Sequence, residues 1–324
     1  QLARAYEVGG QTDEALTVLD ELVTNFPDTL LIDEVQFRRG EMLFLRKRYN
    51  DAEMAYQDVV QYGDTSRFYE QSLYKLGWSQ FKLAWHEESL EPFFELLDRK
   101  IGDADIGEGD SRLATLKRAE RELGANITIA NGKSAIVYMD GAGSIDSFLA
   151  GRNNPHYSYV IYRNLGDLYL EKERFQDAAV TYEAFVAHDP FHPKAPLLQV
   201  EVIEAYKQGG FPSLVLEGKK HFVERYGMDG EFWVRNPRDE NTEVAAHLKS
   251  NLTDLAQYYH AEAQKDGEKS DYLEAANWYR KYLAYFPGEA DSANTNFLLA
   301  EILFESEDYA AATAEYERTA AKPV

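Results

Sequence analysis

Seven histidines are the first candidates for metal binding or acid–base chemistry, and two of them stand four residues apart. His188 and His192 have the spacing at which two side chains on one helical face can share a metal ion. Pro190 lies between them, however, and proline disfavours helical backbone both at its own position and just before it. We therefore expect a loop at this point and a structural role for both histidines.

The acidic stretch IGDADIGEGDS at 101–111 has the residue types of a calcium loop. Its carboxylates belong to Asp103, Asp105, Glu108 and Asp110. A helix–loop–helix calcium site needs Gly where Glu108 stands and a bidentate acid where Ala114 stands. A solvated acidic loop is therefore the expectation, because runs of like charge are usually solvated.

Other kinds of chemistry have no candidate residues. There is no cysteine, so thiolate catalysis, thiolate metal sites and disulfides are excluded. Neither a phosphate-binding glycine loop nor a nucleophile elbow occurs, and carboxylate pairs carry no information among 56 acidic residues. We expect no enzyme, no catalytic residues, no cofactor and no metal site.

The charge balance narrows the choice of partners. Lys and Arg number 34 against 56 Asp and Glu, which gives a formal net charge of −22. Such a chain repels the phosphates of nucleic acids and of anionic lipid, so basic protein segments are its natural complement. No apolar run is long enough to span a membrane. The chain begins at Gln1 inside a helical pattern, from which we expect a processed or excised piece of a longer protein.

The elements that carry these residues repeat along the chain. A small residue followed four positions later by a large apolar one recurs at intervals of 37, from Ala15 to Ala52 to Ser89. The same interval separates Ala178 from Val215, and Ala275 from Ala312. Four equal intervals predict a repeated structural unit.

Each unit has the pattern of two helices. The first helix carries a small residue beside apolar ones, as in Leu76-Gly77 and Leu165-Gly166. The small residue of the second helix marks the closest approach of the two axes, and an aromatic ring one turn later closes the contact. Pro then ends the second helix, as at Pro27, Pro190 and Pro287.

The segment YRNLGDLYLEKERFQDAAVTYEAFVAHDP, residues 162–190, resembles a tetratricopeptide repeat almost position for position. The signature positions of that repeat fall on Tyr162, Leu165, Gly166, Tyr169, Phe175, Ala178, Tyr182 and Pro190. The resemblance covers most of the chain outside 101–155 and 228–243. It implies an all-α fold, a right-handed α-solenoid of about seven helical hairpins.

Two departures from the family pattern stand out. The period is 37 instead of the family's 34, which indicates longer helices or connections. The unit after Pro190 has Val215 where Ala is usual and lacks an aromatic residue one turn later, so its packing should differ.

Two breaks divide the array. We expect repeats at 1–100, an insertion with degenerate helices at 101–155, repeats at 156–227, a linker or long loop at 228–243, and repeats at 244–324. Within the insertion, 126–139 has an Asn-Gly hairpin signal, but the helical neighbourhood favours helix. In the linker, Phe232 and Trp233 should pack against the adjacent repeat.

The resemblance also implies where a partner binds. In the family, first helices line the concave face, and ligand contacts come from positions three before, one after and four after the small site. Counted from Gly40, Gly77 and Gly166, the partner-binding candidates are Phe37, Glu41, Phe44, Tyr74, Trp78, Phe81, Arg163 and Asp167. Five aromatics among them suit a peptide or helix with apolar anchors, although such a stripe is more often core.

Taken together, these patterns predict a protein–protein interaction scaffold. Unit ends such as VTNFPDT and LAYFPGEADS resemble bacterial envelope tetratricopeptide proteins of the BamD and Tol–Pal coordinator type. That resemblance implies a periplasmic or outer-membrane-associated place. The alternatives are a cytoplasmic adaptor or co-chaperone-like regulator, and a glycan- or peptidoglycan-binding module in which Tyr74 and Trp78 stack on sugar rings.

Overall fold

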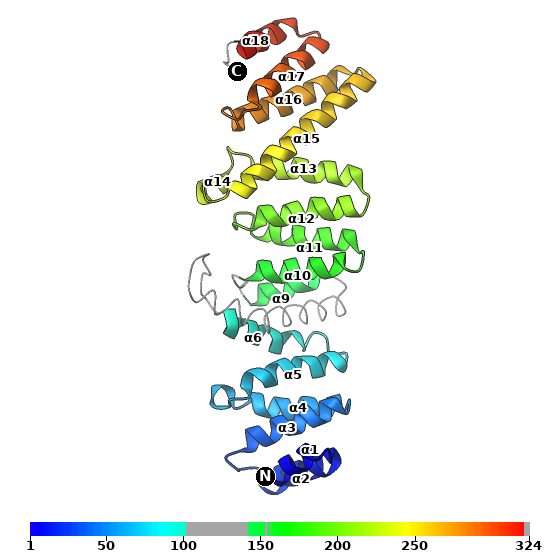
Figure 1. The fold of residues 1–324 in the computed structure, drawn as a ribbon, viewed down its shortest axis with the longest axis vertical. Coiled ribbons are helices and arrows are strands. Elements are labelled where there is room, and N and C mark those ends of the chain that lie inside the picture. The colour runs from blue at the N-terminus through cyan, green and yellow to red at the C-terminus, as the bar shows by residue number, and fades with distance from the viewer. Residues whose placement is uncertain (102–141, 153–154, 156, 321–324) are drawn as a thin grey trace. The chain divides into compact units, whose positions relative to one another are not determined.

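The computed structural model describes residues 1–101, 142–152, 155 and 157–320. In this part of the chain every regular element is a helix (Figure 1), which confirms the predicted all-α class. No described helix is both long and apolar enough to cross a lipid bilayer. The expected helix at 126–139 and the acidic loop at 101–111 lie outside the described residues, apart from residue 101 at the end of a helix.

The chain forms two compact units, Gln1–Leu168 and Tyr169–Val324. The helices of the first unit are α1 (Leu2–Val8), α2 (Thr12–Asn25), α3 (Ile32–Leu45), α4 (Tyr49–Val60), the short 3-10 helix η1 (Gly63–Thr65), α5 (Tyr69–Lys82), α6 (Leu90–Ile101), α9 (Ala142–Gly151) and most of α10 (Ser158–Leu170). Those of the second are α11 (Phe175–His188), α12 (Ala195–Gln208), α13 (Pro212–Tyr226), α14 (Glu231–Arg235), α15 (Thr242–Asp266), α16 (Lys269–Tyr285), α17 (Ser292–Glu305) and α18 (Tyr309–Ala320).

Consecutive helices pack as hairpins within each unit. In the first unit α1 packs on α2, α3 on α4 and α5 on α6; in the second α12 packs on α13, α15 on α16 and α17 on α18. Second helices also contact the first helix of the following hairpin, as α2 contacts α3 and α16 contacts α17. Figure 1 shows this stacking within each unit, which is the hairpin order of an α-solenoid.

The small residues hold the positions that the repeat predicts. Those of the second helices are almost completely buried, with at most 1% of their surface exposed: Ala15, Ala52, Ser89, Ala178, Ala275 and Ala312. On the first helices, a Cβ at Gly40 would lie 2.7 Å from the Tyr56 ring, and one at Gly77 would lie 2.7 Å from the Phe93 ring. Glycine at these sites therefore lets an aromatic ring of the second helix rest directly on the backbone of the first.

The turn inside each hairpin has a common backbone form. A residue with positive φ stands five positions before the small residue in most hairpins, at Gly10, Lys47, Ala84, Glu173, Gly210 and Glu307. Gly267 has the same form in the hairpin of α15 and α16, where the connection is longer. This left-handed residue reverses the chain after the first helix, and any side chain other than Gly adopts it at a cost in free energy.

The proline-marked unit ends and the linker aromatics agree with expectation. Helices α2, α11 and α16 stop two residues before Pro27, Pro190 and Pro287. In the predicted linker, Phe232 is buried, its ring centroid 5.1 Å from that of Tyr226, and the Trp233 indole donates to the Tyr226 carbonyl at 2.8 Å. The predicted packing of these two aromatics against the adjacent repeat is confirmed.

Candidate functional site

The predicted aromatic residues of α5 form one continuous cluster in the first unit. The Trp78 ring lies 6.3 Å from Tyr74 and 5.5 Å from Phe81, both edge to face. Tyr74 and Trp78 also contact Phe93 of α6, at 6.2 and 6.1 Å between ring centroids. Each of the three side chains is half-buried, so each presents only part of its surface to solvent.

The predicted residues of α3 are engaged in packing with neighbouring helices. Phe37 stacks on Phe68 with 4.7 Å between ring centroids, and Phe44 meets Tyr49 edge to face at 5.3 Å. Glu41 accepts a hydrogen bond from the Tyr56 hydroxyl at 2.5 Å.

Lys75 of α5 joins these α3 residues to the α5 cluster. Its Nζ lies 3.0 Å from Glu41 Oε1 and 5.2 Å above the Phe44 ring. The remaining candidates stand on α10, where Arg163 is exposed and Asp167 is half-buried, four residues further along the same helix. The structure thus groups the α3 and α5 residues and leaves two on another helix. Their role as partner contacts stays a prediction.

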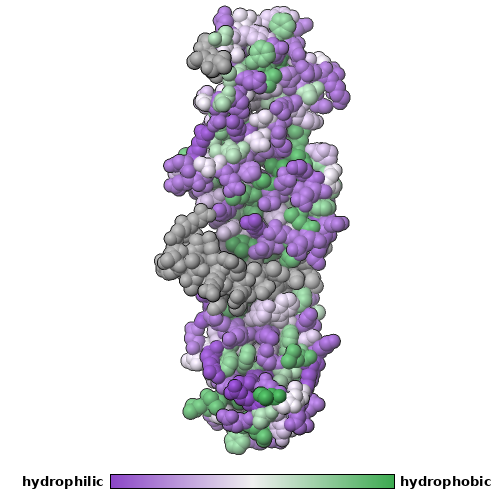
Figure 2. All heavy atoms as spheres, in the orientation of Figure 1, coloured by the Kyte–Doolittle hydropathy of each residue, from purple (hydrophilic) through white to green (hydrophobic). Residues whose placement is uncertain are grey.

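A groove lies in the second unit, between α12, α13 and α15. Its volume is about 610 Å³. Aliphatic side chains of α12 and α13 form its floor: Val200, Ile203, Val215 and Leu216. Figure 2 shows hydrophobic atoms among hydrophilic ones on this part of the second unit.

The turn between the end of α12 and the start of α13 shapes one end of the groove. Gly210 holds the left-handed turn with φ 74°, and Pro212 begins α13 with a ring that suits the first helical turn. Gly209 leaves room for the Phe211 ring, which would lie 2.5 Å from a Cβ at that position. These residues place the apolar groups of the turn at the mouth of the groove.

Helix α15 supplies the polar wall. His247, Ser250, Asn251, Asp254 and Tyr258 stand at positions i, i+3, i+4, i+7 and i+11, so they share one face of this 25-residue helix. The neighbouring face is buried through Val244, Leu248, Leu252 and Leu255, and Asn251 at the border between the two faces is also buried. The helix therefore turns its apolar side to the core and its polar side to the groove.

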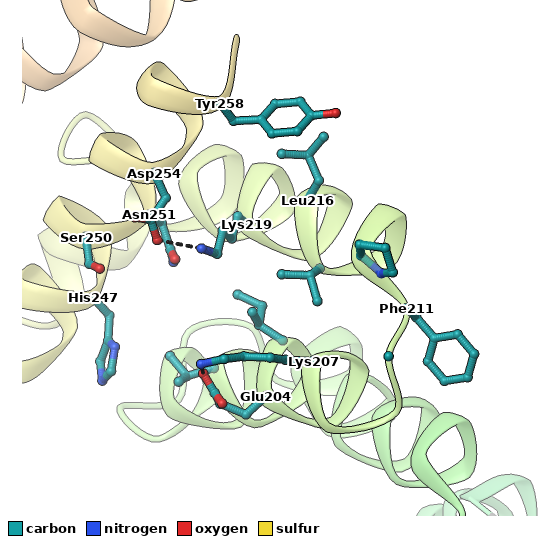
Figure 3. Close-up of a pocket in the computed structure, with 15 residues that line it drawn as sticks. Glu204, Lys207, Phe211, Leu216, Lys219, His247, Ser250, Asn251, Asp254 and Tyr258 are labelled. Carbon is teal, nitrogen blue, oxygen red and sulfur yellow. Dashed lines mark hydrogen bonds and ion pairs between the residues drawn. The ribbon is translucent and has the colours of Figure 1, made fainter. Parts of the chain in front are cut away.

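Two ion pairs border the space (Figure 3). Lys219 of α13 pairs with Asp254 of α15, and Lys207 pairs with Glu204 along α12 at 3.2 Å. The carboxylates remain accessible, with 45% of the Asp254 side chain and 43% of the Glu204 side chain exposed. An apolar floor edged by balanced charges suits an apolar side chain on a polypeptide better than a small charged ligand.

The groove opens where the hairpin departs from the repeat. Ile203 occupies the first-helix site that is Gly in the α3 and α5 hairpins, and Lys219 occupies the site of the closing ring. In this hairpin the large side chain belongs to α12 and the small residue to α13. A Cβ at Gly218 would lie 3.0 Å from Ile203 Cγ1. The interior is filled from α12, and residue 219 is left to line the groove.

Neither His188 nor His192 lines the groove. The His192 Nδ1 accepts a hydrogen bond from the Lys194 backbone N–H at 3.1 Å, and its ring packs on Phe185 at 5.2 Å. His188 is the last residue of α11, so the predicted loop between the two histidines is confirmed. Across the residues that the structure describes, no three His, Asp or Glu side chains gather as metal ligands.

With this geometry established, comparison with known proteins finds one family model. The tetratricopeptide repeat model matches residues 1–29, so the segment that forms α1 and α2 is similar to that repeat. No curated protein is significantly similar to the chain.

Several solved structures align over most of the chain at low identity. The C-terminal part of a TPR repeat-containing protein from Cytophaga hutchinsonii is 11% identical, with a TM-score of 0.33 and coverage of 91% of this chain and 98% of that one. The structure of Naa15/Naa10 bound to HypK-THB is 12% identical, with a TM-score of 0.36 and coverage of 98% of this chain and 46% of that one. The TPR domain of P58(IPK) is 14% identical, with a TM-score of 0.26 and coverage of 98% of this chain and 81% of that one. Likeness at this level carries no inference about ligands.

The tetratricopeptide spacing contains a signal for the groove that counting from glycine missed. Ile203 stands 37 residues after Gly166, at the small site of its own hairpin. Counting three before, one after and four after Ile203 gives Val200, Glu204 and Lys207, and all three line the groove. The predicted partner contacts were counted from glycines alone, so they left out the hairpin in which Ile203 takes the place of the small residue.

Proposed function

We propose that this chain is a protein-interaction scaffold that holds peptide or helical segments of partner proteins, with the groove of α12, α13 and α15 as a binding site. The observation that carries the proposal is the position of Val200, Glu204 and Lys207. These residues stand at the family's ligand positions on a first helix and line the groove. Tetratricopeptide repeats are protein-interaction modules, which fits this use.

The composition of the groove supports a polypeptide ligand. An apolar side chain entering it would cover Val200, Val215 and Leu216, which are half-buried in the free chain. Burying apolar surface contributes roughly 25 cal/mol per Å², so one anchoring side chain supplies a useful share of the binding free energy. The polar face of α15 lies beside this floor and offers hydrogen-bond partners to the backbone of a segment.

The aromatic residues of α3 and α5 are a second proposed contact surface. Tyr74, Trp78 and Phe81 are half-buried and contiguous, and aromatic residues are enriched where proteins bind one another. The net charge of −22 favours basic segments at both places.

We also propose that the scaffold works in the envelope of a Gram-negative bacterium. The support is the resemblance of its aromatic-Pro unit ends to envelope tetratricopeptide proteins. Cell fractionation of the full gene product tests this placement. Recovery in the cytoplasm would overturn it and favour an adaptor there.

Selection of peptides tests the groove directly. A random peptide library displayed on phage is selected against the purified chain, and the enriched peptides are titrated against two variants. Leu216→Glu places a charge on the apolar floor, whereas Val180→Glu changes a 57% exposed residue of α11 that is not part of the groove lining. We expect about tenfold weaker binding or more to Leu216→Glu, and unchanged binding to Val180→Glu.

Two outcomes would overturn the groove as the binding site. One is a library that yields no peptide binding above background. The other is a set of peptides that bind Leu216→Glu as well as the unaltered chain. Peptides of the second kind are then titrated against a chain in which Phe37, Phe44, Tyr74, Trp78 and Phe81 are polar, and loss of binding there would move the site to α3 and α5.

A further inference from the structure

One position on the second helix of each hairpin distinguishes the hairpin that borders the groove from the others. Within the described residues the repeat spacing marks seven hairpins, and five of them carry an aromatic residue four positions after the small site of the second helix: Tyr56, Phe93, Tyr182, Tyr279 and Tyr316. The hairpin of α1 and α2 has Leu19 there, buried to 2% exposure. The hairpin of α12 and α13 alone has a charged residue, Lys219.

The interior of this hairpin is complete without a ring. Ile203 is 4% exposed and reaches Gly218 of α13, so large and small residues have exchanged helices. An exchange of this kind conserves volume in the core. The missing ring is therefore not a packing defect. The position on α13 that carries a ring in those hairpins carries Lys219 here and borders the groove.

Lys219 does not occupy that space as a ring would. Its ammonium is drawn to Asp254 on α15, as Figure 3 shows, and only its aliphatic stem lies along the groove. Leu216 and Tyr258 stand beside the opening, from α13 and α15 (Figure 3). An aromatic side chain entering the groove would therefore meet aliphatic groups on its faces and Tyr258 near its edge.

The charges at the rim select what flanks that side chain. Glu204 and Asp254 each hold one lysine, yet each carboxylate is more than 40% exposed and can accept further hydrogen bonds. The chain as a whole carries −22, so an acidic segment is repelled and a basic one attracted. Lysine or arginine beside the anchor fits both conditions.

We propose that the groove is a socket for an aromatic side chain of a partner protein, carried on a segment with basic residues beside it. The partner then supplies the ring that the other hairpins supply from their own second helix. This inference rests on the proposed scaffold function and names the chemistry of its ligand.

A set of matched peptides tests the chemistry. The probe is a short Gly–Ser peptide with a central Phe and Lys two positions to either side, and its relatives have Leu or Ala at the centre, or Glu in place of Lys. Binding is followed by the methyl NMR signals of Ile203, Val215 and Leu216 in the full chain. We expect the Ala peptide to bind about tenfold more weakly, the Leu peptide several-fold more weakly, and the Glu peptide not to bind measurably.

A variant that supplies the ring from within tests the socket. Ile203→Ala combined with Lys219→Tyr reproduces the pair of Ala263 and Tyr279 found in the hairpin of α15 and α16. We expect the new ring to fill the groove and weaken the Phe peptide about tenfold or more. The matched control is Lys265→Tyr, which makes the same change at a 68% exposed lysine of α15 outside the groove and should leave binding unchanged.

The outcomes separate the two proposals. Equal affinity for the Phe and Leu peptides, with both lost in Leu216→Glu, would reject the aromatic socket and leave the scaffold function standing. Full binding of the Phe peptide to a folded closing variant would reject the socket as well. If no peptide moves the three methyl signals, the groove itself fails as a binding site. The peptide series on the unaltered chain decides the matter even where the closing variant does not fold.

Discussion

The hairpin of α5 and α6 and the hairpin of α12 and α13 follow one spacing and reach opposite results. In the first, Gly77 admits the Phe93 ring, which would lie 2.7 Å from an added Cβ. In the second, Ile203 takes the place of the glycine and Lys219 that of the ring. Both interiors are full, but only the second borders a groove of about 610 Å³.

The difference shows that the surface beside a hairpin depends on which of its two helices supplies the large side chain of the interior. When the ring comes from the second helix, it also supports the aromatic cluster of Tyr74 and Trp78 on α5. When the bulk comes from the first helix, the second helix can present a charged residue instead. A repeat can thus gain a binding site without losing its core.

The largest expected contrast is between the two residues at the ring position. Phe93→Ala should lower the free energy of unfolding by about 4 kcal/mol, because it leaves a cavity against Gly77. Lys219→Ala should lower it by about 1 kcal/mol or less, since it removes only a partly exposed ion pair. Urea denaturation of the two variants measures both values. Similar losses would mean that Lys219 has a packing role like that of the ring.

A smaller effect concerns Tyr279, the tyrosine at the ring position of the hairpin of α15 and α16, and its ionisation at high pH. Burial raises the pKa of Tyr279 to about 12, and its hydroxyl lies 3.0 Å from His260 Nδ1. The folded chain holds this proton more tightly than the unfolded chain, in which the pKa is about 10. The contribution of Tyr279 to stability is therefore complete below pH 10 and is lost as the pH rises toward 12.

Tyr279→Phe should lose stability less steeply than the unaltered chain over that pH range. Urea denaturation at successive pH values measures the slope, with Tyr258→Phe on the preceding helix α15 as the control for removing a hydroxyl. Parallel curves for the unaltered chain and Tyr279→Phe would contradict the assignment of this titration to the ring position.

The smallest contrast lies in the hairpin turns. Ala84 and Gly210 occupy the same left-handed turn position, with φ of 63° and 74°. Ala84→Gly should raise the free energy of unfolding by about 0.5 kcal/mol, because it relieves backbone strain but loosens the unfolded chain. Gly210→Ala should lower the free energy of unfolding by about 1 kcal/mol, because alanine adopts the left-handed backbone at a cost that glycine does not have. Thermal denaturation checks the two signs, and a loss in Ala84→Gly would show that the turn is not strained.

Much of the fold was predictable because the repeat rests on steric rules. The buried Ala52 and Ser89, the glycine beneath Tyr56, and the helix end before Pro190 each follow from residue size or from the missing N–H of proline. These features depend on neighbours at fixed helical spacing. A single sequence is sufficient to locate them.

The candidate site was harder to predict from the sequence, because it depends on where individual side chains point. Glu41 was predicted as a ligand contact, but it accepts a hydrogen bond from Tyr56 and pairs with Lys75. The groove arises from a compensating exchange between Ile203 and Gly218 on different helices. Sequence analysis marked the missing aromatic after Val215 as a packing anomaly, and only the arrangement of α15 shows that the anomaly opens onto a groove.

The central claim is that Ile203 and Lys219 together replace the small residue and the ring of the other hairpins. A double-mutant cycle on the free energy of unfolding tests it most directly. Ile203→Ala alone should cost about 3 kcal/mol, and Lys219→Tyr alone about 1 kcal/mol from overpacking against Ile203. The pair should recover most of this loss, with a coupling free energy of about 2 kcal/mol. Effects that simply add, within about 0.5 kcal/mol, would contradict the account.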